Sequence, residues 1–230
     1  MRPLAHRMGE SLFMTFKKSQ FYLRDLYNTV RYGGSCPLSA QRIYIDPRKI
    51  TYYTSYSKTG MKRRFTGKVM GGDWDIRVSR IEESDKYRAC YRHFIQNTPW
   101  SESGVYESFA RRFSRHSSPD GCASWSDVEE RYAGVDALFS SLQSGGEFKT
   151  QKQLKGKRAF REYGGVLIHI DRHGLPLFGA GGWHRMIMAQ LLHLERIPAQ
   201  LGVVHTEALR NNRFSLSPTG ALISYREQTE

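Results

Sequence analysis

The fold is decided around Gly179-Ala180-Gly181-Gly182-Trp183-His184-Arg185, at the centre of residues 164–205. Before this turn, the β-branched run at 166–170 predicts a strand, a hairpin turn follows at 171–174, and 175–178 predicts a returning strand. After the turn, apolar residues recur at helical spacing from 184 to 194, and 197–204 predicts a last strand. The stretch therefore predicts strand, turn, strand, glycine turn, helix and strand.

The glycine turn has the composition of a phosphate site. A helix that opens directly after glycines presents unpaired N–H groups and the positive end of its dipole, and glycines let a ligand approach the backbone. His184 and Arg185 fall in the first turn of this helix, where a cation is disfavoured unless an anion lies beside it. The alternative is a tight turn whose His184 and Arg185 face solvent or pair with a carboxylate.

The Gly-Gly-Trp-His-Arg turn, its apolar helix and the following Ile197-Pro198-Ala199-Gln200-Leu201 resemble the ParB/sulfiredoxin superfamily. Sulfiredoxins carry Gly-Gly-Cys-His-Arg at the equivalent place and ParB proteins Gly-Glu-Arg-Arg, and both hold nucleotide phosphates on the following helix. The pattern looks closest to a ParB-like nuclease-domain branch of microbes and phages, over roughly 124–209 and more weakly over 42–113. Trp183 stands where sulfiredoxins have their reactive cysteine, so the resemblance implies no sulfinic-acid reductase activity.

This resemblance implies an α+β fold: a small mixed β-sheet core of the ParB/sulfiredoxin type, with surrounding helices and a basic helical N-terminal extension. We expect a basic amphipathic extension at 1–41, a basic unit of strand, loops and two helices at 42–120, the core at 121–209 and a polar, peripheral tail at 210–230. The segment 37–41 is expected to be a linker.

The resemblance also places a nucleoside triphosphate, ATP or CTP, on the glycine turn. The residues expected to hold it are Gly181, Gly182, Trp183, His184, Arg185, Lys149, Thr150 and Lys152. The last three lie in a segment with five cations within ten residues, 149–158, where ParB-like relatives have a second phosphate grip; a solvated loop is the alternative.

A catalytic role is expected for His184 and Arg185, which would neutralise charge growing on the phosphates. Glu162 and Asp171 are the candidate carboxylates for a Mg²⁺ ion, chosen because they are near in sequence. Neither the metal site nor catalysis itself is decided by these residues. Asp73 and Asp75 are a further carboxylate pair, which would bind a divalent ion or cap a helix.

The formal charge of +13 is uneven, because residues 1–120 hold 22 Lys and Arg against 11 Asp and Glu, a net +11. A basic surface fits a polyanionic partner such as DNA or RNA, and Lys62, Arg63 and Arg64 follow a Tyr-rich stretch suited to nucleic acid. General solubility is the alternative explanation.

Residues 11–32 predict an amphipathic helix that ends at Gly33-Gly34. Its apolar residues Leu23, Leu26, Tyr27 and Val30 are expected to pack on the domain, with a membrane-surface helix as the alternative. The sequence shows no apolar run long enough to span a membrane and no signal-peptide core. The three cysteines have no metal or disulfide spacing, which favours the cytoplasm.

Helix boundaries are also predicted in the middle of the chain. Ser84 is the expected N-cap of one helix, a second helix follows Trp100, and Ser126-Asp127-Val128-Glu129 has the pattern of a capping box.

Two functions remain open after this reading. The first is a nucleotide-binding protein that hydrolyses the nucleotide or transfers its phosphoryl group. The second is a basic DNA- or RNA-binding protein that uses the ParB-like core as a scaffold. A structural domain with neither ligand is the third alternative.

Overall fold

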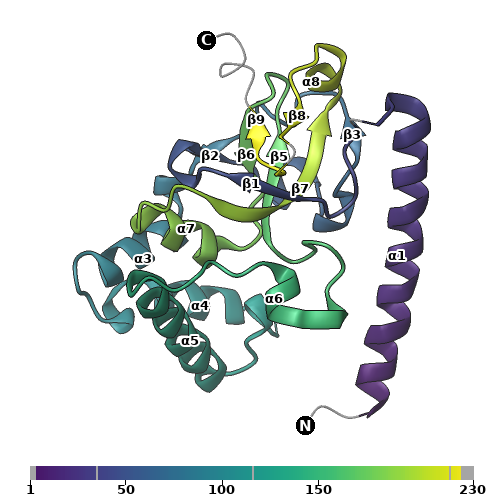
Figure 1. Ribbon diagram of the computed structural model, residues 1–230. Coiled ribbons are helices and arrows are strands. Elements are labelled where there is room, and N and C mark those ends of the chain that lie inside the picture. Colours follow the sequence, from purple (N-terminus) through teal and green to yellow (C-terminus); the bar gives the residue numbers. More distant parts are fainter. Residues whose placement is uncertain (1–3, 35, 116, 218, 224–230) are drawn as a thin grey trace.

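The computed structural model describes residues 4–34, 36–115, 117–217 and 219–223, with only the backbone described for 4–15 and 223. The fold is mixed α/β: a strongly twisted sheet with both parallel and antiparallel pairs lies beside a layer of helices (Figure 1). This confirms the predicted mixed sheet surrounded by helices.

Seven strands of the described chain form this sheet in the order β1-β7-β5-β6-β2-β4, with β3 also paired to β7. They are β1 (Arg42–Ile45), β2 (Tyr52–Tyr53), β3 (Val69–Met70), β4 (Ser79–Arg80), β5 (Val166–Ile170), β6 (Pro176–Phe178) and β7 (Ile197–His205).

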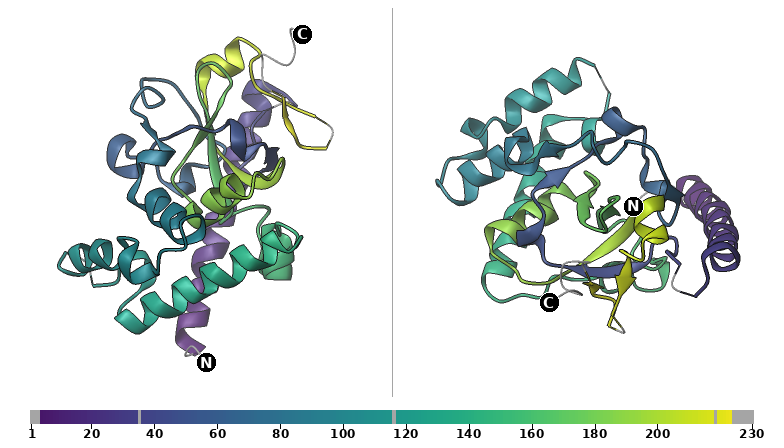
Figure 2. Two further views of the ribbon diagram at one scale, coloured as in Figure 1. Left: turned by 90° about the vertical axis from the view of Figure 1, so that its left-hand side faces the viewer. Right: turned by 90° about the horizontal axis from the view of Figure 1, so that it is seen from above.

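The helices of the described chain are short apart from two. They are α1 (Leu4–Tyr32), α2 (Tyr56–Thr59), α3 (Asp85–Phe94), α4 (Val105–Phe113), α5 (Trp125–Gln143), α6 (Gln151–Lys155), α7 (Trp183–Leu191) and α8 (Thr206–Arg210). Helices α3 to α7 gather on one side of the sheet, while α1 stands apart along one edge of the molecule (Figures 1 and 2). Among the described residues, no helix combines the length and the apolar character needed to span a bilayer.

Strand β7 is the centre of the sheet, and all nine of its residues are buried. It runs antiparallel to β1 and parallel to β5, and β5 forms an antiparallel hairpin with β6. The chain passes from β6 to β7 through α7, so β6 and α7 together form the connection between the parallel strands β5 and β7. The predicted sequence of strand, hairpin, strand, helix and strand is therefore confirmed.

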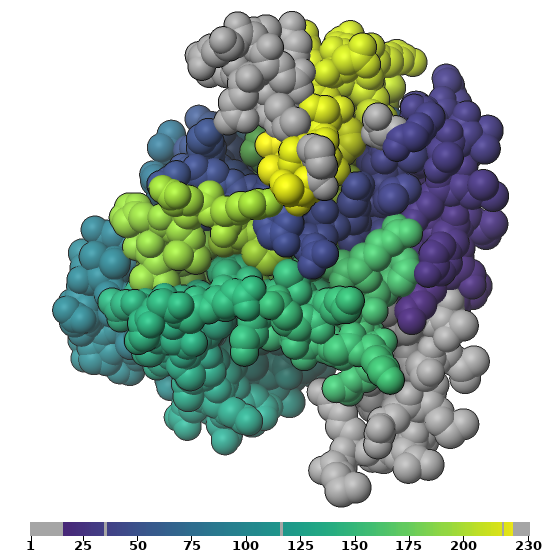
Figure 3. All heavy atoms as spheres, viewed as in Figure 1, coloured from purple at the N-terminus to yellow at the C-terminus, as the bar shows by residue number. Residues whose placement is uncertain are grey.

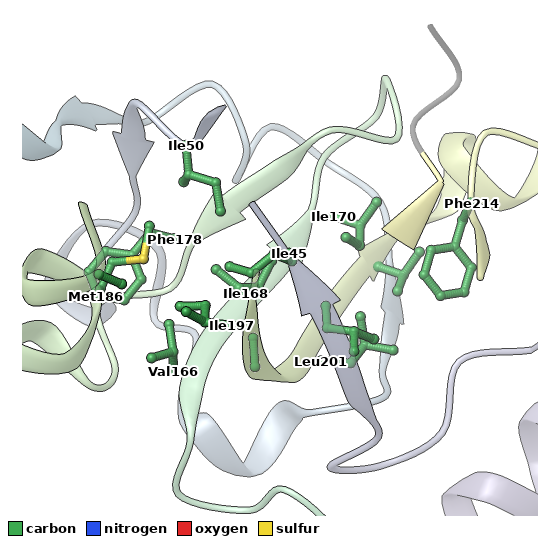
Figure 4. Close-up of a cluster of buried hydrophobic side chains, with 14 of the residues drawn as sticks. Ile45, Ile50, Val166, Ile168, Ile170, Phe178, Met186, Ile197, Leu201 and Phe214 are labelled. Carbon is green, nitrogen blue, oxygen red and sulfur yellow. The ribbon is translucent and has the colours of Figure 1, made fainter. Parts of the chain in front are cut away.

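The main core lies between the sheet and α7 (Figure 4). Alternate residues of β5, namely Val166, Ile168 and Ile170, point into it, as the period of two in a strand dictates. Met186 and Ala189 of α7 meet them, with both side chains fully buried.

A second core joins α3, α4, α5 and α7. Ser84 caps α3 by accepting a hydrogen bond from the backbone N–H of Tyr87 at 3.1 Å, as predicted. The predicted capping box of α5 is wrong by two residues: Ser124 is the N-cap, and the carboxylate of Asp127 accepts from the N–H of Ser124. Trp125 therefore begins the helix and stacks on Tyr106 of α4.

The orientation of α1 contradicts the sequence prediction. Leu23, Leu26 and Val30 face away from the domain, with exposures of 62–82%. The packed side consists of Phe21, which stacks on Phe160, and two buried polar residues. An amphipathic pattern gives an apolar stripe but not the direction in which the stripe faces.

The buried polar residues of α1 are satisfied by the segment predicted to be a linker. Asp25 accepts from the backbone N–H of Ser39 at 2.7 Å and pairs with Arg161 at 2.5 Å. Asn28 donates to the carbonyls of Pro37 and Gly67 at 2.6 and 2.8 Å. Segment 37–41 is consequently an anchored part of the fold.

The C-terminal segment is docked as far as residue 223. Ala208 of α8 and Phe214 are buried in the main core, and β8 (Ser215–Leu216) pairs with β9 (Leu222–Ile223). The N–H of Tyr44 donates to the carbonyl of Gly220 at 2.9 Å. The expectation of a peripheral tail is wrong for these residues; the rest of that call, 224–230, lies outside the described residues.

Candidate functional site at the glycine turn

The glycine turn continues the hairpin before it enters α7. The N–H of Gly179 donates to the carbonyl of Leu167 at 2.8 Å, and the N–H of Leu167 donates to the carbonyl of Gly181 at 2.9 Å. Gly182 is the N-cap residue of α7, with φ 84° and ψ 38°, and no side chain caps the helix there. This left-handed conformation and the uncapped amides are the geometry predicted from the glycines.

The three side chains in the first turn of α7 point in different directions. Trp183 packs edge-on against Tyr53 and Phe178, at ring-centroid distances of 4.8 and 4.7 Å. His184 meets Tyr132 of α5 edge-on at 5.4 Å. Only Arg185 lies toward the segment that precedes α6 (Gln151–Lys155).

The expectation that His184 joins Arg185 at the phosphates is therefore not supported by the geometry. Burial lowers the pKa of His184 to about 3, so the ring is neutral near pH 7. Its Nε2 is buried and has no hydrogen-bond partner within the described part of the chain. Because the imidazole is neutral, Arg185 is the one cation left of the two that the sequence places in the first turn of α7.

Arg185 is folded over the chain just before α6. Its guanidinium lies 4.3 Å from the ring centroid of Phe148, and Nη2 donates to the carbonyl of Lys149. Nη1 is buried and has no partner among the described residues. Burial lowers the pKa of Arg185, with the charge of Glu162 acting in the opposite direction.

Arg63 is the residue whose place the sequence did not predict. The sequence predicts that it belongs to a nucleic-acid surface with Lys62 and Arg64, but it turns inward from the 3-10 turn η2 (Arg63–Phe65) to the glycine turn. Its Nη1 donates to the carbonyl of Gly165 at 2.7 Å and to Oε1 of Gln200 at 2.6 Å. A Cβ at Gly181 would overlap its Nη2, so this glycine is what lets the guanidinium lie there.

Lys155 completes a group of three cations. Its Nζ lies over Gly164, where a Cβ would stand 2.8 Å from it, and donates to the carbonyl of Tyr163 at 3.3 Å. Burial lowers its pKa, and the charges of Arg63 and Arg185 lower it further. We call Arg63, Lys155, Arg185 and Glu162 the glycine-turn cluster.

Glu162 is the carboxylate of this cluster. Its side chain is buried, and Oε1 accepts from the backbone N–H of Gln151 at 3.0 Å. Burial raises its pKa, although the Gln151 amide and the positive charges of Arg185 and Lys155 oppose this. The cluster thus holds three cations against one carboxylate.

Gln200 adds a second unpaired donor. Its Oε1 accepts from Arg63 and from the N–H of Gly164 at 2.9 Å, while its buried Nε2 has no partner among the described residues. Buried donors are rarely left unpaired, because each costs about 1–3 kcal/mol. No sequence signal distinguished Gln200, since it is one residue of a buried strand.

The residues expected to form the second grip lie around the start of α6. Thr150 is the N-cap of α6 and exchanges hydrogen bonds with Gln153, so its hydroxyl caps the helix. Lys149 and Lys152 have exposed side chains. Lys155, within the same basic segment, takes the position near the glycines.

Asp171 cannot share a metal ion with Glu162 at the glycine turn. Gly182 lies beside Val166 at the start of β5, whereas Asp171 follows the other end of that strand. At roughly 3.3 Å per residue, about 17 Å of strand separates Asp171 from the glycine turn. Its Oδ1 accepts from the N–H groups of His173 and Leu175, both at 2.8 Å, which closes the hairpin turn.

Asp73 and Asp75 hold an arginine. The Nη2 of Arg172 lies 2.9 Å from Asp73 and 2.7 Å from Asp75, and its Nε also donates to Asp75 at 2.9 Å. In the described part of the chain, no three His, Cys, Asp or Glu side chains gather closely enough to hold a metal ion.

A hollow of about 670 Å³ lies on another side of the molecule, between β1, β2 and β6. Its charged lining includes Asp46, Lys49 and Asp171, and none of the glycine-turn cluster reaches it. We give the cluster more weight because unpaired buried donors and an excess of cations call for a ligand, whereas volume alone does not.

Comparison of the chain with known proteins finds no matching family model, no matching curated protein and no matching solved structure.

Proposed function

We propose that this chain binds a nucleoside triphosphate, ATP or CTP, at the glycine turn within a ParB/sulfiredoxin-like fold. The observation that carries the proposal is the glycine-turn cluster, in which two partly buried arginines and the exposed Lys155 lie beside an uncapped helix start. Nη1 of Arg185 and Nε2 of the neighbouring Gln200 are buried donors without a partner among the described residues. A polyphosphate would supply the missing negative charge and the missing acceptors.

Under this proposal each residue of the site has a role. Arg63, Lys155 and Arg185 neutralise the phosphates, and the first amides of α7 donate to them. Gly181 and Gly182 keep the approach free of side chains. His184 has a supporting role in this arrangement, because its ring packs into the helical layer instead of facing the ligand.

A Mg²⁺ ion fits the site only in the company of phosphates. Mg²⁺ usually takes one or two carboxylates together with phosphate oxygens and water, and Glu162 is the carboxylate of the cluster. Glu162 would hold the ion, which would supply positive charge to the phosphates. We extend the proposal to slow hydrolysis or phosphoryl transfer, in which the cations of the cluster would stabilise the charge that develops on the phosphates.

The test is isothermal titration with ATP and CTP in the presence of Mg²⁺. Arg63→Ala and Arg185→Ala should each weaken binding roughly ten- to a hundredfold, because a hydrogen bond to a charged group contributes about 1.5–3 kcal/mol. Arg64→Ala is the matched control, since its exposed side chain lies next to Arg63 in the sequence. Equal affinity in a folded Arg63→Ala variant would contradict the proposal.

One observation favours nucleic acid as a second ligand. Arg24, Arg64 and Lys68 share a surface beside α1, and Lys68 Nζ lies 4.2 Å from the ring centroid of Phe65. Burial, then Arg24 and Arg64, lower the pKa of Lys68, which places these cations close together. Fluorescence anisotropy with duplex and single-stranded DNA tests this. Affinity should fall with salt by about 0.9 log units per phosphate contact per log unit of salt, and Arg64→Glu with Lys68→Glu should reduce that slope.

A further inference from the structure

The long helix α1 carries an apolar face that the described structure leaves largely uncovered; of its members, Tyr22 at the edge meets Phe160 edge-on at a ring-centroid distance of 5.7 Å. Its members share high exposure and helical spacing: Phe16 (65%), Tyr22 (57%), Leu23 (68%), Leu26 (62%), Tyr27 (61%) and Val30 (82%). At about 100° per residue they fall within an arc of roughly 140°. We call these six residues the α1 face. An exposed apolar patch of this kind marks an interaction site.

The α1 face lies opposite the side that binds the domain. Phe21, Asp25 and Asn28 are buried against segment 37–41 and its neighbours, so α1 cannot roll over to cover its apolar side without breaking those contacts. The view from above shows α1 at the periphery, with the rest of the molecule on one side of it only (Figure 2). The space-filling view shows the same helix along one edge of the molecule (Figure 3).

The face is free of charge, although the protein carries +13. The basic side chains of residues 16–34 are Lys17, Lys18, Arg24 and Arg31, and all lie outside the arc. Arg24 donates to the carbonyls of Arg64 and Thr66, and Lys17 lies 5.6 Å from the ring centroid of Tyr163. Two of these cations are thus directed at the protein's own body.

The spacing of the face is that of a coiled-coil seam. Phe16, Leu23 and Val30 recur every seven residues, Leu26 occupies the complementary position of the second repeat, and the small, uncharged Ser19 occupies that position in the first. The flanking positions, where coiled coils usually carry charges that choose the partner, hold Gln20, Tyr22, Tyr27 and Thr29. A seam without charge does not repel a second copy of itself.

We propose that the α1 face pairs with the α1 face of a second copy of this chain, forming a two-fold dimer. In a two-fold dimer the same patch of each copy faces its own counterpart. An uncharged seam favours such a dimer, because bringing two identical seams together creates no repulsion between like charges. An anionic lipid surface is less suited, because a membrane-surface helix needs basic side chains available to the lipid. An acidic partner helix would likewise find no cation on the face.

The test is light scattering after size exclusion, over a series of protein concentrations. The wild-type chain should reach twice the monomer mass of 26.6 kDa as concentration rises. The double variant Leu23→Glu with Leu26→Glu should keep the monomer mass over the whole series. Val30→Glu, near the end of the helix, provides a second seam variant if the double variant does not fold.

Arg31→Glu is the matched control. It changes the charge of the chain by the same two units as the double variant, but it lies outside the face and should leave the dimer intact. A wild-type chain that stays monomeric at every concentration would overturn the proposal. So would an Arg31→Glu variant that dissociates as fully as the seam variant. A monomeric wild-type chain that binds phosphatidylserine vesicles, together with loss of that binding in the seam variant, would also overturn the proposal, in favour of a lipid surface.

Discussion

Gly181 is the residue on which the guanidinium of Arg63 rests, and this contact allows a sharp test. Gly181→Ala places a Cβ where Nη2 of Arg63 lies, so Arg63 must move. We expect nucleotide affinity to fall roughly ten- to a hundredfold, the same loss as removing Arg63 itself. Titration calorimetry beside a melting curve measures this.

Gly134→Ala is the matched control, because it makes the same glycine-to-alanine change away from the glycine turn. Gly134 lies in the middle of α5 with nothing within 4 Å of a Cβ, so alanine there should stabilise the helix by about 1 kcal/mol. Nucleotide binding unaffected by Gly181→Ala would mean that Arg63 does not contact the ligand.

His184 should make the protein sensitive to acid. Its pKa is about 3 in the folded protein and about 6.5 in an unfolded chain, so below pH 6.5 the unfolded state binds the extra proton. Stability is then fully present above the unfolded pKa and declines as pH falls toward about 3, by up to about 1.4 kcal/mol per pH unit.

His184→Phe should reduce that slope by about the same amount, since phenylalanine keeps the ring against Tyr132 and removes the unpaired Nε2. His169, whose pKa burial also lowers to about 3, would still contribute its own share. Urea unfolding at a series of pH values provides the measurement. Parallel stability curves for the two proteins would show that the histidine is not buried as described.

At the scale of elements, periodicity and glycines predicted most of what surrounds the site. Strands β5 and β7 and helix α7 were predicted because alternation and helical spacing are local properties of the chain. Arg63, Lys155 and Gln200 were not recognised as one group, because they come from η2, α6 and β7 and meet only through tertiary packing. The direction of α1 was missed for the same reason: Asp25 and Asn28 are buried only because segment 37–41 satisfies them.

Asp120 joins α3, α4 and α5 and provides the prediction at this scale. Its Oδ2 lies 2.8 Å from both Lys86 Nζ and Arg112 Nη1, and Arg131 donates to its carbonyl at 3.2 Å. Burial would raise the pKa of Asp120, but the three cations outweigh burial and hold it below its usual value. Asp120→Asn should therefore destabilise the helical layer by about 1–3 kcal/mol near pH 7.

The sign of the pH effect follows from the lowered pKa. The stability that Asp120 contributes is present above its unfolded pKa of about 3.9 and is lost as pH falls through the lower folded value. The wild-type chain and Asp120→Asn should therefore differ at neutral pH and converge in acid. Urea unfolding of both proteins at neutral pH and in acid provides the measurement. A difference in the free energy of unfolding that stays the same at the two pH values would contradict the prediction.

At the scale of the whole molecule, the basic front half and the glycine turn are not separate. Strands from residues 42–80 lie in the same sheet as β5, β6 and β7, and Arg63 reaches from that part of the chain to the glycine turn. Charge counted along the sequence cannot show this, because it records how many cations a segment holds and not where each one points.

A ligand at the glycine turn should consequently stabilise the entire chain. The cluster draws Arg63 from η2, Lys155 from α6 and Arg185 from α7, so a polyphosphate would tie the sheet to the helical layer. At a nucleotide concentration about 100 times Kd, binding adds about 2.7 kcal/mol of stability. For a chain of this size that corresponds to a rise in Tm of roughly 5–11 °C in a single transition. At the same nucleotide concentration, Arg63→Ala should lose most of that rise while Arg64→Ala keeps it. An equal rise in Tm for both variants would mean that the nucleotide binds elsewhere on the molecule. No rise in Tm for the wild-type chain would contradict nucleotide binding itself.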